Sequence, residues 1–376
     1  MGTSRARNAV ISATLLLSFS GGAADVTAEP KPAEPKLASR TSSQPEADVI
    51  FTGMCDASGA VALDDRLFAV ANDEDNIVRV YDAERGGPPL HAYDLSPVLP
   101  LRNPASKAGK AKPPKPGKAP EEADIEAATK LKDVSYWLTS HGRNSKGKKK
   151  AARFMVFATT TPRQGQTLAL VGQPYVSLLQ DFAASPALRE LGLARAAQLP
   201  PKQAGGLNME GLTAMADGSG MFIGFRNPVP KGRALLVPWS NPREVMDGER
   251  ANLGAPILLD LGGRGVRALS WWRGQYLIVA GHHSEGGGTA QLYSWSGQGA
   301  PRVISAADLT GFNPEGFFTP EGRTQIMLMS DDGSVPRSGA ACKDLPDPTH
   351  RRFRGRWLQV PPATGAGAGN PPGSRH

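Results

Sequence analysis

One pattern occurs five times along the chain, and this repeat constrains the fold more than any other feature of the sequence. Each copy consists of a turn, an apolar strand, a hairpin, a second apolar strand and a polar cluster. The copies are CDASGAVALDDRLFAVANDEDN, ADIEAATKLKDVSYWLTSHGRN, NMEGLTAMADGSGMFIGFRNP, GVRALSWWRGQYLIVAGHHSEG and NPEGFFTPEGRTQIMLMSDDG. Because short alternating or apolar runs broken by Gly, Pro, Asn and Asp are typical of β-strands, the repeat indicates an all-β protein.

Further strand-like runs follow most copies, such as NIVRVYD after the first and TAQLYSWS after the fourth. Repeats of about 40 to 50 residues with about four strands each are typical of β-propeller blades. The sequence therefore predicts a β-propeller with five blades of four strands.

The two ends of the repeat region predict how the ring closes. After the last copy only RGRWLQV reads as a strand, whereas ADVIFTG is an unassigned strand before the first copy. Pairing this N-terminal strand into the last blade closes the ring without an exposed edge. Cys55 and Cys342 are the two cysteines, so only one pairing is possible, and we expect a disulfide that fastens the closure.

The N-terminal residues predict an exported protein. Arg5 and Arg7 precede an apolar stretch that is too short to span a bilayer, which is typical of a signal peptide. We therefore expect a periplasmic or secreted protein, a monomer that does not bind membranes after cleavage. The expected segments are a signal peptide over 1–28, a Pro/Lys/Glu-rich linker over 29–45, the propeller over 46–360 and a disordered Gly/Pro tail over 361–376.

Two insertions widen the repeat spacing, at 103–121 and 161–205. The second contains the one helix-like stretch, residues 175–199, which Pro186 is expected to split.

The formal net charge of +8 is concentrated in two runs. Residues 103–120 contain five lysines and no acid, and residues 143–153 contain six lysines and arginines, so the rest of the chain is net acidic. Because like-charge runs without aromatic residues are typical of solvated loops, we interpret both as exposed loops and expect no nucleic-acid partner.

Polar residues from all five copies are expected to meet. In a propeller blade the first strand lines the central channel and the second runs antiparallel beside it, so the start of the first and the end of the second share one face. The residues expected at this mouth are Asp56, Asp73, Glu74, Asp75, Glu126, His141, Arg143, Asn144, Glu210, Arg226, Asn227, Arg267, His282, His283, Glu315, Asp331 and Asp332.

Crowded carboxylates predict a hard cation with oxygen ligands, and calcium fits best. The expected metal ligands are Glu126, Glu210, Glu315, Asp331 and Asp73. Arginines beside them can hold a planar oxyanion, and a metal with arginines supports ester hydrolysis. The expected catalytic residues are Arg226, Arg267, His282 and His141, and the expected substrate-binding residues are Arg143, Asn227 and His283.

Structural roles are the alternative. A Glu or Asp in a strand-opening turn can accept backbone N–H bonds and lock neighbouring blades, with Gly211 and Gly316 serving the turn. His282 and His283 can equally be ordinary loop residues, and Asp331 and Asp332 can cap a turn before Gly333.

Three stretches carry a resemblance to a known family. SGAVALDDRLFAVANDEDNIVRVYD, DIEAAT with YWLTSHGRNSKGK, and GFRNPVPKGRALLVPWSNP with LDLGGRGVRALSWW resemble an uncharacterised family of exported bacterial propellers, a domain of unknown function similar to the phytase-like esterase propellers. The resemblance covers about residues 46–360, and FRNP and SHGRN are its most specific parts. It implies the fold and a site, and an activity only by analogy.

Other catalytic motifs are missing from the sequence. It has no G-x-S-x-G elbow, H-E-x-x-H pair or complete EF-hand loop, and GRGVRA leads into a strand rather than the helix that a dinucleotide loop requires. Two classes of function are left: a metal-dependent hydrolase of phosphoesters, or a non-catalytic propeller that binds a small anionic ligand or a protein on the same face.

Overall fold

The computed structural model describes residues 48–101, 120–161, 167–284, 289–305 and 307–363. The predicted signal peptide and linker, nearly all of the 103–121 insertion and most of the predicted tail lie outside the described residues. The described residues belong to one compact unit.

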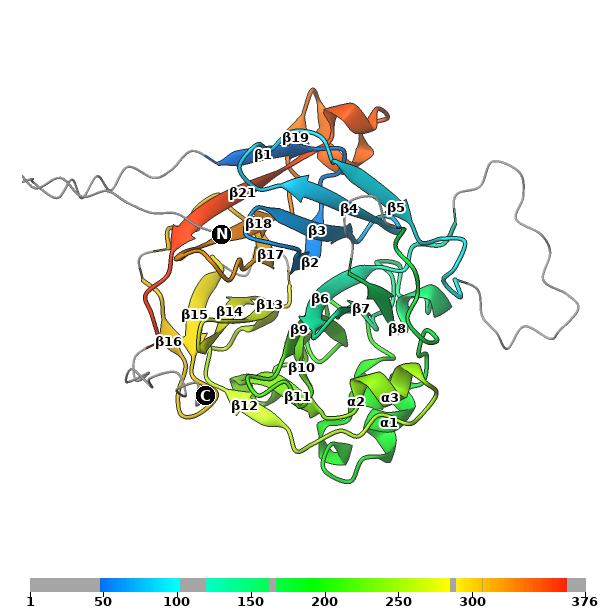
Figure 1. Cartoon of the computed structure of the whole chain (residues 1–376). Helices are drawn as coiled ribbons and strands as arrows, with labels where there is room; N and C mark the ends of the chain where they lie inside the picture. The colour runs from blue at the N-terminus through cyan, green and yellow to red at the C-terminus, as the bar shows by residue number, and fades with distance from the viewer. Residues whose placement is uncertain (1–47, 102–119, 162–166, 285–288, 306, 364–376) are drawn as a thin grey trace, which may run out of the picture. The chain divides into compact units, whose positions relative to one another are not determined.

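Five antiparallel sheets stand around a common centre and form the blades of a propeller (Figure 1). The first blade is β2 (Ala57–Ala62), β3 (Leu67–Asn72), β4 (Ile77–Asp82) and β5 (His91–Asp94). The second is β6 (Ile125–Leu131), β7 (Val134–Thr139) and β8 (Val156–Thr160). The third is β9 (Asn208–Ala214), β10 (Met221–Asn227), β11 (Ala234–Trp239) and β12 (Ile257–Leu259). The fourth is β13 (Gly265–Trp272), β14 (Gln275–Gly281), β15 (Gln291–Trp295) and β16 (Arg302–Val303).

The fifth blade joins the two ends of the unit. It consists of β17 (Pro314–Phe318), β18 (Gln325–Ser330), β21 (Arg352–Gln359) and, at its outer edge, β1 (Val49–Thr52). Strand β1 pairs antiparallel with β21, from Val49 opposite Gly355 to Thr52 opposite Arg352. The predicted closure by the N-terminal strand is therefore confirmed.

A disulfide joins Cys55 and Cys342, as the sequence predicts, with 6.0 Å between their Cα atoms. Cys55 follows β1, and Cys342 opens a short segment that precedes β21. This segment contains β19 (Pro336–Arg337), β20 (Ala340–Ala341), η4 (Cys342–Asp344) and η5 (Pro348–His350). The covalent bond thus lies beside the closing pair of strands, where separation would open the ring.

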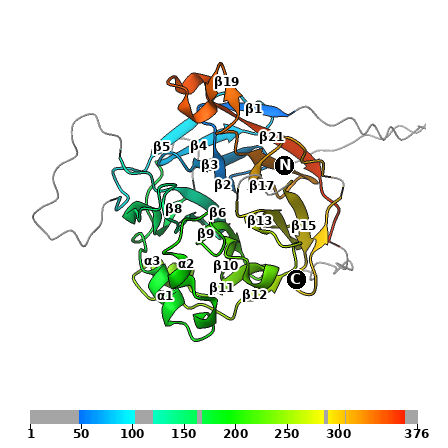
Figure 2. The ribbon, with the colours of Figure 1, turned by 180° about the vertical axis from the view of Figure 1, so that it is seen from behind.

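The inner strands β2, β6, β9, β13 and β17 form the wall of a central channel. Each contacts the inner strands of both neighbouring blades, and β17 contacts β2 to complete the circle. Figure 2 shows the same ring from behind, with α1, α2 and α3 gathered beside the second and third blades. The predicted all-β, five-bladed propeller is confirmed.

The second blade differs from the prediction of four strands. Beyond β8, only isolated bridges join Val156 to Tyr175 and Thr159 to Leu170, so the fourth position is irregular. The chain then forms α1 (Leu178–Ala184), η2 (Arg189–Leu191) and α2 (Leu193–Ala196). Helix α1 ends two residues before Pro186, where the sequence predicts a break. The sequence also did not predict α3 (Pro242–Met246), η1 (Ala151–Arg153), η3 (Pro230–Gly232) or the short elements between β18 and β21.

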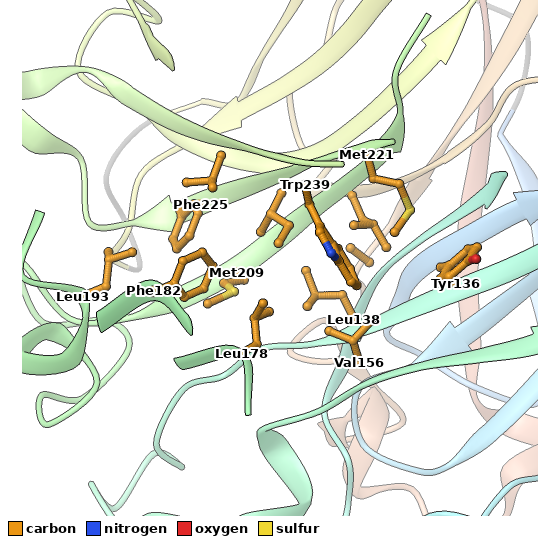
Figure 3. Close-up of a cluster of buried hydrophobic side chains, with 14 of the residues drawn as sticks. Tyr136, Leu138, Val156, Leu178, Phe182, Leu193, Met209, Met221, Phe225 and Trp239 are labelled. Carbon is orange, nitrogen blue, oxygen red and sulfur yellow. The ribbon is translucent and has the colours of Figure 1, made fainter. Parts of the chain in front are cut away.

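Apolar side chains fill the spaces between blades and under the helices. In Figure 3, Phe182 of α1 lies against Phe225 of β10, near Trp239 and Met209. The Phe182 and Phe225 rings meet edge to face with 5.8 Å between their centroids. Full burial of a side chain of this size stabilises a fold by about 1.5–3 kcal/mol, so the helical insertion is part of the core.

An aromatic cluster holds β1 in place. Phe51 stacks on Phe353 of β21 at 4.8 Å and meets Phe68 and Tyr81 of the first blade at 5.4 and 5.3 Å. The closing strand is therefore anchored to both the first and the fifth blade. Among the described residues, no helix has the length and apolarity needed to cross a bilayer.

Candidate functional site

Every inner strand carries a β-bulge near its start. In each blade the pairing with the second strand shifts register at the same place. The residues at the shifts are Ser58, Glu126, Glu210, Arg267 and Glu315. A bulge inserts an extra residue and re-aims a side chain. All of these except Arg267 line a narrow cavity formed by residues of the five inner strands.

Glycines beside the bulges let the inner strands approach closely. A Cβ atom on Gly316 would lie 2.4 Å from the carbonyl oxygen of Ser58, and one on Gly59 would lie 2.4 Å from the backbone of Ala127. These contacts are too short for any side chain. Gly59 and Gly316 therefore allow the inner strands to pack closely. The structural alternative had expected Gly316 to serve the strand-opening turn.

One half of this mouth is balanced in charge. Nη1 of Arg226 lies 2.7 Å from a carboxylate oxygen of Glu210 and 4.0 Å from Glu315. Arg267 pairs with Glu315 and lies 3.7 Å from Glu210. All four side chains are at most one-tenth exposed. Because a buried charge is costly without a partner, these two arginines and two glutamates depend on one another.

Two asparagines complete this balanced half. Asn208 donates to Glu210 at 2.7 Å, and Asn313 accepts from Arg267 at 2.6 Å. Each asparagine precedes a bulged glutamate by two residues, Asn208 as the first residue of β9 and Asn313 immediately before β17. We call the six residues of the third to fifth blades the balanced half: Asn208, Glu210, Arg226, Arg267, Asn313 and Glu315.

The other half is acidic. Carboxylate oxygens of Asp56, Asp73 and Glu74 lie within 4.8 Å of one another, and so do those of Asp73, Asp124 and Glu126. Asp73 belongs to both groups. We call these residues, with Asp331, which bridges to Asp56 through the backbone, the acidic half.

Burial and mutual repulsion change the protonation of the acidic half. Burial, with the hydrogen bond and charge of Asp331, raises the pKa of Asp56 to about 9. Burial raises the pKa of Asp73 and of Glu126 well above the usual range, with further repulsion from Asp56 on Asp73 and from Glu210 on Glu126. Burial raises the pKa of Asp124 to about 6, although Arg153 acts in the opposite direction. The site therefore favours either bound protons or a bound cation.

The protein supplies few counter-charges here. Arg153 lies 2.7 Å from Asp124, and Lys343 lies 2.7 Å from Glu74. Neither bonds to Asp73, whose buried Oδ1 atom has no hydrogen-bond partner among the described residues. The hydroxyl of Ser58, a fully buried residue, also has no partner in this part of the chain.

The predicted metal ligands fall into both halves. Asp73, Glu126 and Asp331 lie in the acidic half, whereas Glu210 and Glu315 are paired with arginines. Asp331 accepts from Asn313 at 3.1 Å and from the backbone N–H of Gly333 at 2.9 Å, so it also caps the turn before that glycine.

The predicted histidines lie at the edge of the balanced half. The carbonyl oxygen of His282 accepts from Nε of Arg226 at 3.0 Å, and its ring lies 5.7 Å from that of His283. Burial and the charges of His282 and Arg226 lower the pKa of His283. His141 is almost fully buried beside the Thr139 carbonyl, and burial lowers its pKa to about 4.

Two predicted substrate-binding residues make local structural contacts. Arg143 donates to Ala197, Gly147 and Gln198, and holds the helical insertion. Asn227 donates to the carbonyl oxygens of Pro201 and Gln203.

The sequence suggested that the basic run 143–153 is a solvated loop, but one end of this run is largely buried. Its last residue, Arg153, is 13% exposed and pairs with both Asp124 and Glu122. The acidic residues of the second blade draw this end of the run inward.

Sequence reasoning missed Asp124 and Ser58. Asp124 precedes Glu126 by two residues, the same spacing that relates Asn208 to Glu210 and Asn313 to Glu315. Aligning the copies on this pair would have identified the position. Nothing in the sequence marks the Ser58 hydroxyl, because its lack of a partner depends on packing.

The comparisons with known proteins identify little beyond the architecture. Residues 176–309 match a family model described as a protein of unknown function (DUF3616). The matched stretch contains the third and fourth blades, but not the strands that carry the acidic half. No match was found among curated proteins.

Similar solved structures include a PQQ-bound aldose sugar dehydrogenase from Streptomyces coelicolor, 12% identical over 84% of this chain and 98% of that chain, with a TM-score of 0.40. A putative oxidoreductase (glucose dehydrogenase) from Thermus thermophilus is 13% identical over 83% and 100%, with a TM-score of 0.39. An exo-β-1,3-galactanase from Phanerochaete chrysosporium is 11% identical over 84% and 64%, with a TM-score of 0.43. With TM-scores this low, the likenesses carry no argument about activity. The expected similarity to phytase-like propellers is not shown.

Proposed function

We propose that the protein is a divalent-cation-binding propeller and that the acidic half holds the cation. The observation that carries the proposal is the position of Asp73, whose carboxylate belongs to both groups of converging acids and has an oxygen without a hydrogen-bond partner in the described structure. A cation there would relieve the repulsion that raises the pKa values of its neighbours.

The donor set favours calcium. The two groups offer carboxylate oxygens from Asp56, Asp73, Glu74, Asp124 and Glu126, and neither group contains histidine or cysteine. Hard cations such as calcium take six to eight oxygen ligands in flexible geometry, whereas zinc and copper favour nitrogen and sulfur. Water and backbone carbonyls would complete the coordination.

A cation at this position would join blades. Asp56 and Asp73 belong to the first blade, and Asp124 and Glu126 belong to the second. Asp331, beside Asp56, comes from the fifth. Binding to the folded state alone would stabilise it by about 2.7 kcal/mol at a hundredfold excess over the dissociation constant.

Calorimetric titration of the chelated protein with calcium chloride tests the proposal. Wild type should bind saturably, and Asp73→Asn should bind at least tenfold more weakly. Asp133→Asn is the matched control, because Asp133 is exposed in the β6–β7 hairpin, at the far end of the second blade from the acidic half. No saturable binding by wild type, or equal affinity in the two variants, would refute the proposal.

Hydrolysis of phosphoesters is a second candidate, supported by the two buried arginines next to the acids. The pairing of Arg226 and Arg267 with Glu210 and Glu315 weighs against it, because an incoming phosphate would have to compete with two buried carboxylates. Calcium-dependent release of p-nitrophenol from p-nitrophenyl phosphate, lost in Arg226→Gln but retained in Arg66→Gln, would place hydrolysis first.

The proposal also includes export of the protein from the cytoplasm. The Cys55–Cys342 disulfide favours an oxidising compartment such as the periplasm or the extracellular medium. Recovery of the disulfide-linked peptide from the exported protein, and of free thiols from protein retained in the cytoplasm, would be the expected result of a non-reducing digest.

A further inference from the structure

A second cavity lies at the opposite mouth of the channel, away from the acidic half. Its volume is about 500 Å³, within the range of about 300–1,000 Å³ typical of small-molecule sites. Residues at the ends of the inner strands and in the hairpins after them line it, including residues 60–65, 128–130 and 270–274. We call it the hairpin cavity.

Trp271 gives the hairpin cavity an aromatic wall. It is partly exposed, and its ring lies against Tyr276 with 4.7 Å between centroids. Four of the six tryptophans donate their indole N–H, with Trp272 of the same strand bonding to the Pro320 carbonyl at 2.6 Å. Trp271 has no acceptor among the described residues, so its N–H is free for a ligand.

Hydroxyl groups from four blades contribute to the same lining: Thr129, Thr213, Ser270 and Thr319. The Thr213 hydroxyl oxygen accepts from the backbone of Trp271 at 2.7 Å, and that of Thr129 accepts from the backbone of Ala214 at 3.1 Å. Both hydroxyls therefore retain their own proton to donate. Those of Ser270 and Thr319 bond to each other at 3.0 Å.

The charges of the hairpin cavity are mixed. Lys130 and Glu321 make no ion pair or hydrogen bond within the described residues, whereas Asp65 accepts from the backbone of Gly322. Arg273 lies over the ring of Trp272 and donates to the Arg323 carbonyl. The lining contains three acids, including Asp64, and two cationic residues, so it does not favour a strongly charged ligand.

We propose that the hairpin cavity binds a neutral carbohydrate. A sugar ring offers an apolar C–H face that stacks on an aromatic side chain, and hydroxyls that both donate and accept. Trp271 supplies the aromatic surface and a free donor, and the threonines supply donors at several positions around the channel. This site is independent of the cation site and would exist in its absence.

Binding of cellobiose, maltose and lactose, followed by tryptophan fluorescence and calorimetry, tests the inference. At least one should bind wild type saturably, and Trp271→Leu should weaken it by about tenfold, the value expected for one lost aromatic stacking contact. Trp357→Leu is the matched control, because Trp357 is also partly exposed without an acceptor for its N–H in the described structure, but lies outside the cavity. It should bind like wild type.

Ser270→Ala provides a second variant should Trp271→Leu fail to fold, and it should also weaken binding. No saturable binding of the three sugars, or equal losses in the Trp271 and Trp357 variants, would overturn the inference. Asp73→Asn should bind the same sugar unchanged, so failure here leaves the cation proposal standing, and the reverse also holds.

Discussion

The balanced half and the acidic half occupy equivalent positions in the repeat but treat charge in opposite ways. In the balanced half, buried arginines pair with buried glutamates, so the charges offset one another within the protein, although Oδ1 of Asn208, Oε2 of Glu210 and Nε of Arg267 have no hydrogen-bond partner among the described residues. In the acidic half, six carboxylates converge with two cationic side chains at their edge.

The difference shows how a repeated backbone separates architecture from chemistry. The bulge places one side chain from each blade at the mouth whatever that side chain is: Ser58, Glu126, Glu210, Arg267 or Glu315. Where the repeat supplies arginine, the carboxylates have their counter-charges within the protein. Where it supplies only acids, the counter-charge has to come from solvent, as protons or as a cation.

The largest effect should follow removal of an arginine from the balanced half. Arg267→Met leaves Glu210 and Glu315 buried with one cation between them, so the free energy of unfolding should fall by about 3–5 kcal/mol. Chemical denaturation measures this. Arg66→Met, which removes a largely exposed guanidinium that pairs with Asp82, should change stability little, because backbone N–H groups of Glu84 and Arg85 also donate to Asp82. Equal effects in the two variants would mean that the buried ion pairs of the balanced half contribute no more to stability than the pair made by the exposed Arg66.

Loss of the disulfide should affect stability next most strongly. The double variant Cys55→Ser, Cys342→Ser should lose about 2–5 kcal/mol, because the bond constrains nearly the whole chain in the unfolded state. Cys55 directly precedes Asp56, and its carbonyl accepts from the backbone of Asp332 at 3.0 Å. Calcium affinity should therefore fall as well. Unchanged affinity would show that the acidic half is positioned without the bond.

The pH dependence of stability also distinguishes the acidic half from the balanced half. Asp56 has a pKa of about 9 in the fold against 3.8 unfolded, so the folded state holds the extra proton between these values. Stability without metal should therefore fall as the pH rises from about 7 to 9, by at most about 1.4 kcal/mol per pH unit for each such proton. Asp331, Glu74 and Lys343 face this carboxyl, and the two acids strengthen the effect.

Saturating calcium should flatten this decline, because the bound ion replaces the proton. Thermal denaturation across this pH range, with chelator and with calcium, checks it. A decline that is the same in both conditions would argue against a cation at Asp56.

The smallest effect should have the opposite sign. Asp73→Asn replaces a buried carboxyl that has to take up a proton on folding with a neutral side chain of the same shape, so the metal-free protein should gain about 0.5–2 kcal/mol. Denaturation in chelator measures the gain, with Asp133→Asn as the control. A loss comparable to that of Arg267→Met would mean that Asp73 is a structural partner rather than an excess charge.

The sequence predicted the architecture well because the repeat is local. Hairpins of fixed length and apolar alternation identified the five blades, and the unmatched end strands identified the closure through β1. The irregular fourth position of the second blade was missed, since the chain there packs α1 against Phe225 rather than adding a full strand.

The sequence predicted which residues gather at the mouth of the channel, but not how they divide into a balanced half and an acidic half. Strand polarity placed the acids and arginines at one mouth. Which glutamate meets which arginine depends on bulges and on neighbouring blades, so the pairing of Glu210 and Glu315 with Arg226 and Arg267 could not be read from spacing. Asp124 was overlooked although its spacing to Glu126 repeats in two other blades.

The most direct test of the account is proton release on calcium binding, because only the acidic half is expected to hold protons that a cation replaces. Calorimetric titrations at about pH 7, in buffers with different ionisation enthalpies, count the protons displaced by each bound ion. We expect at least one proton per calcium in wild type, because Asp56 is protonated at this pH and the ion must replace that proton. No calcium binding would contradict a cation site in the acidic half, and binding without proton release would contradict the protonated Asp56 on which the division of the mouth rests.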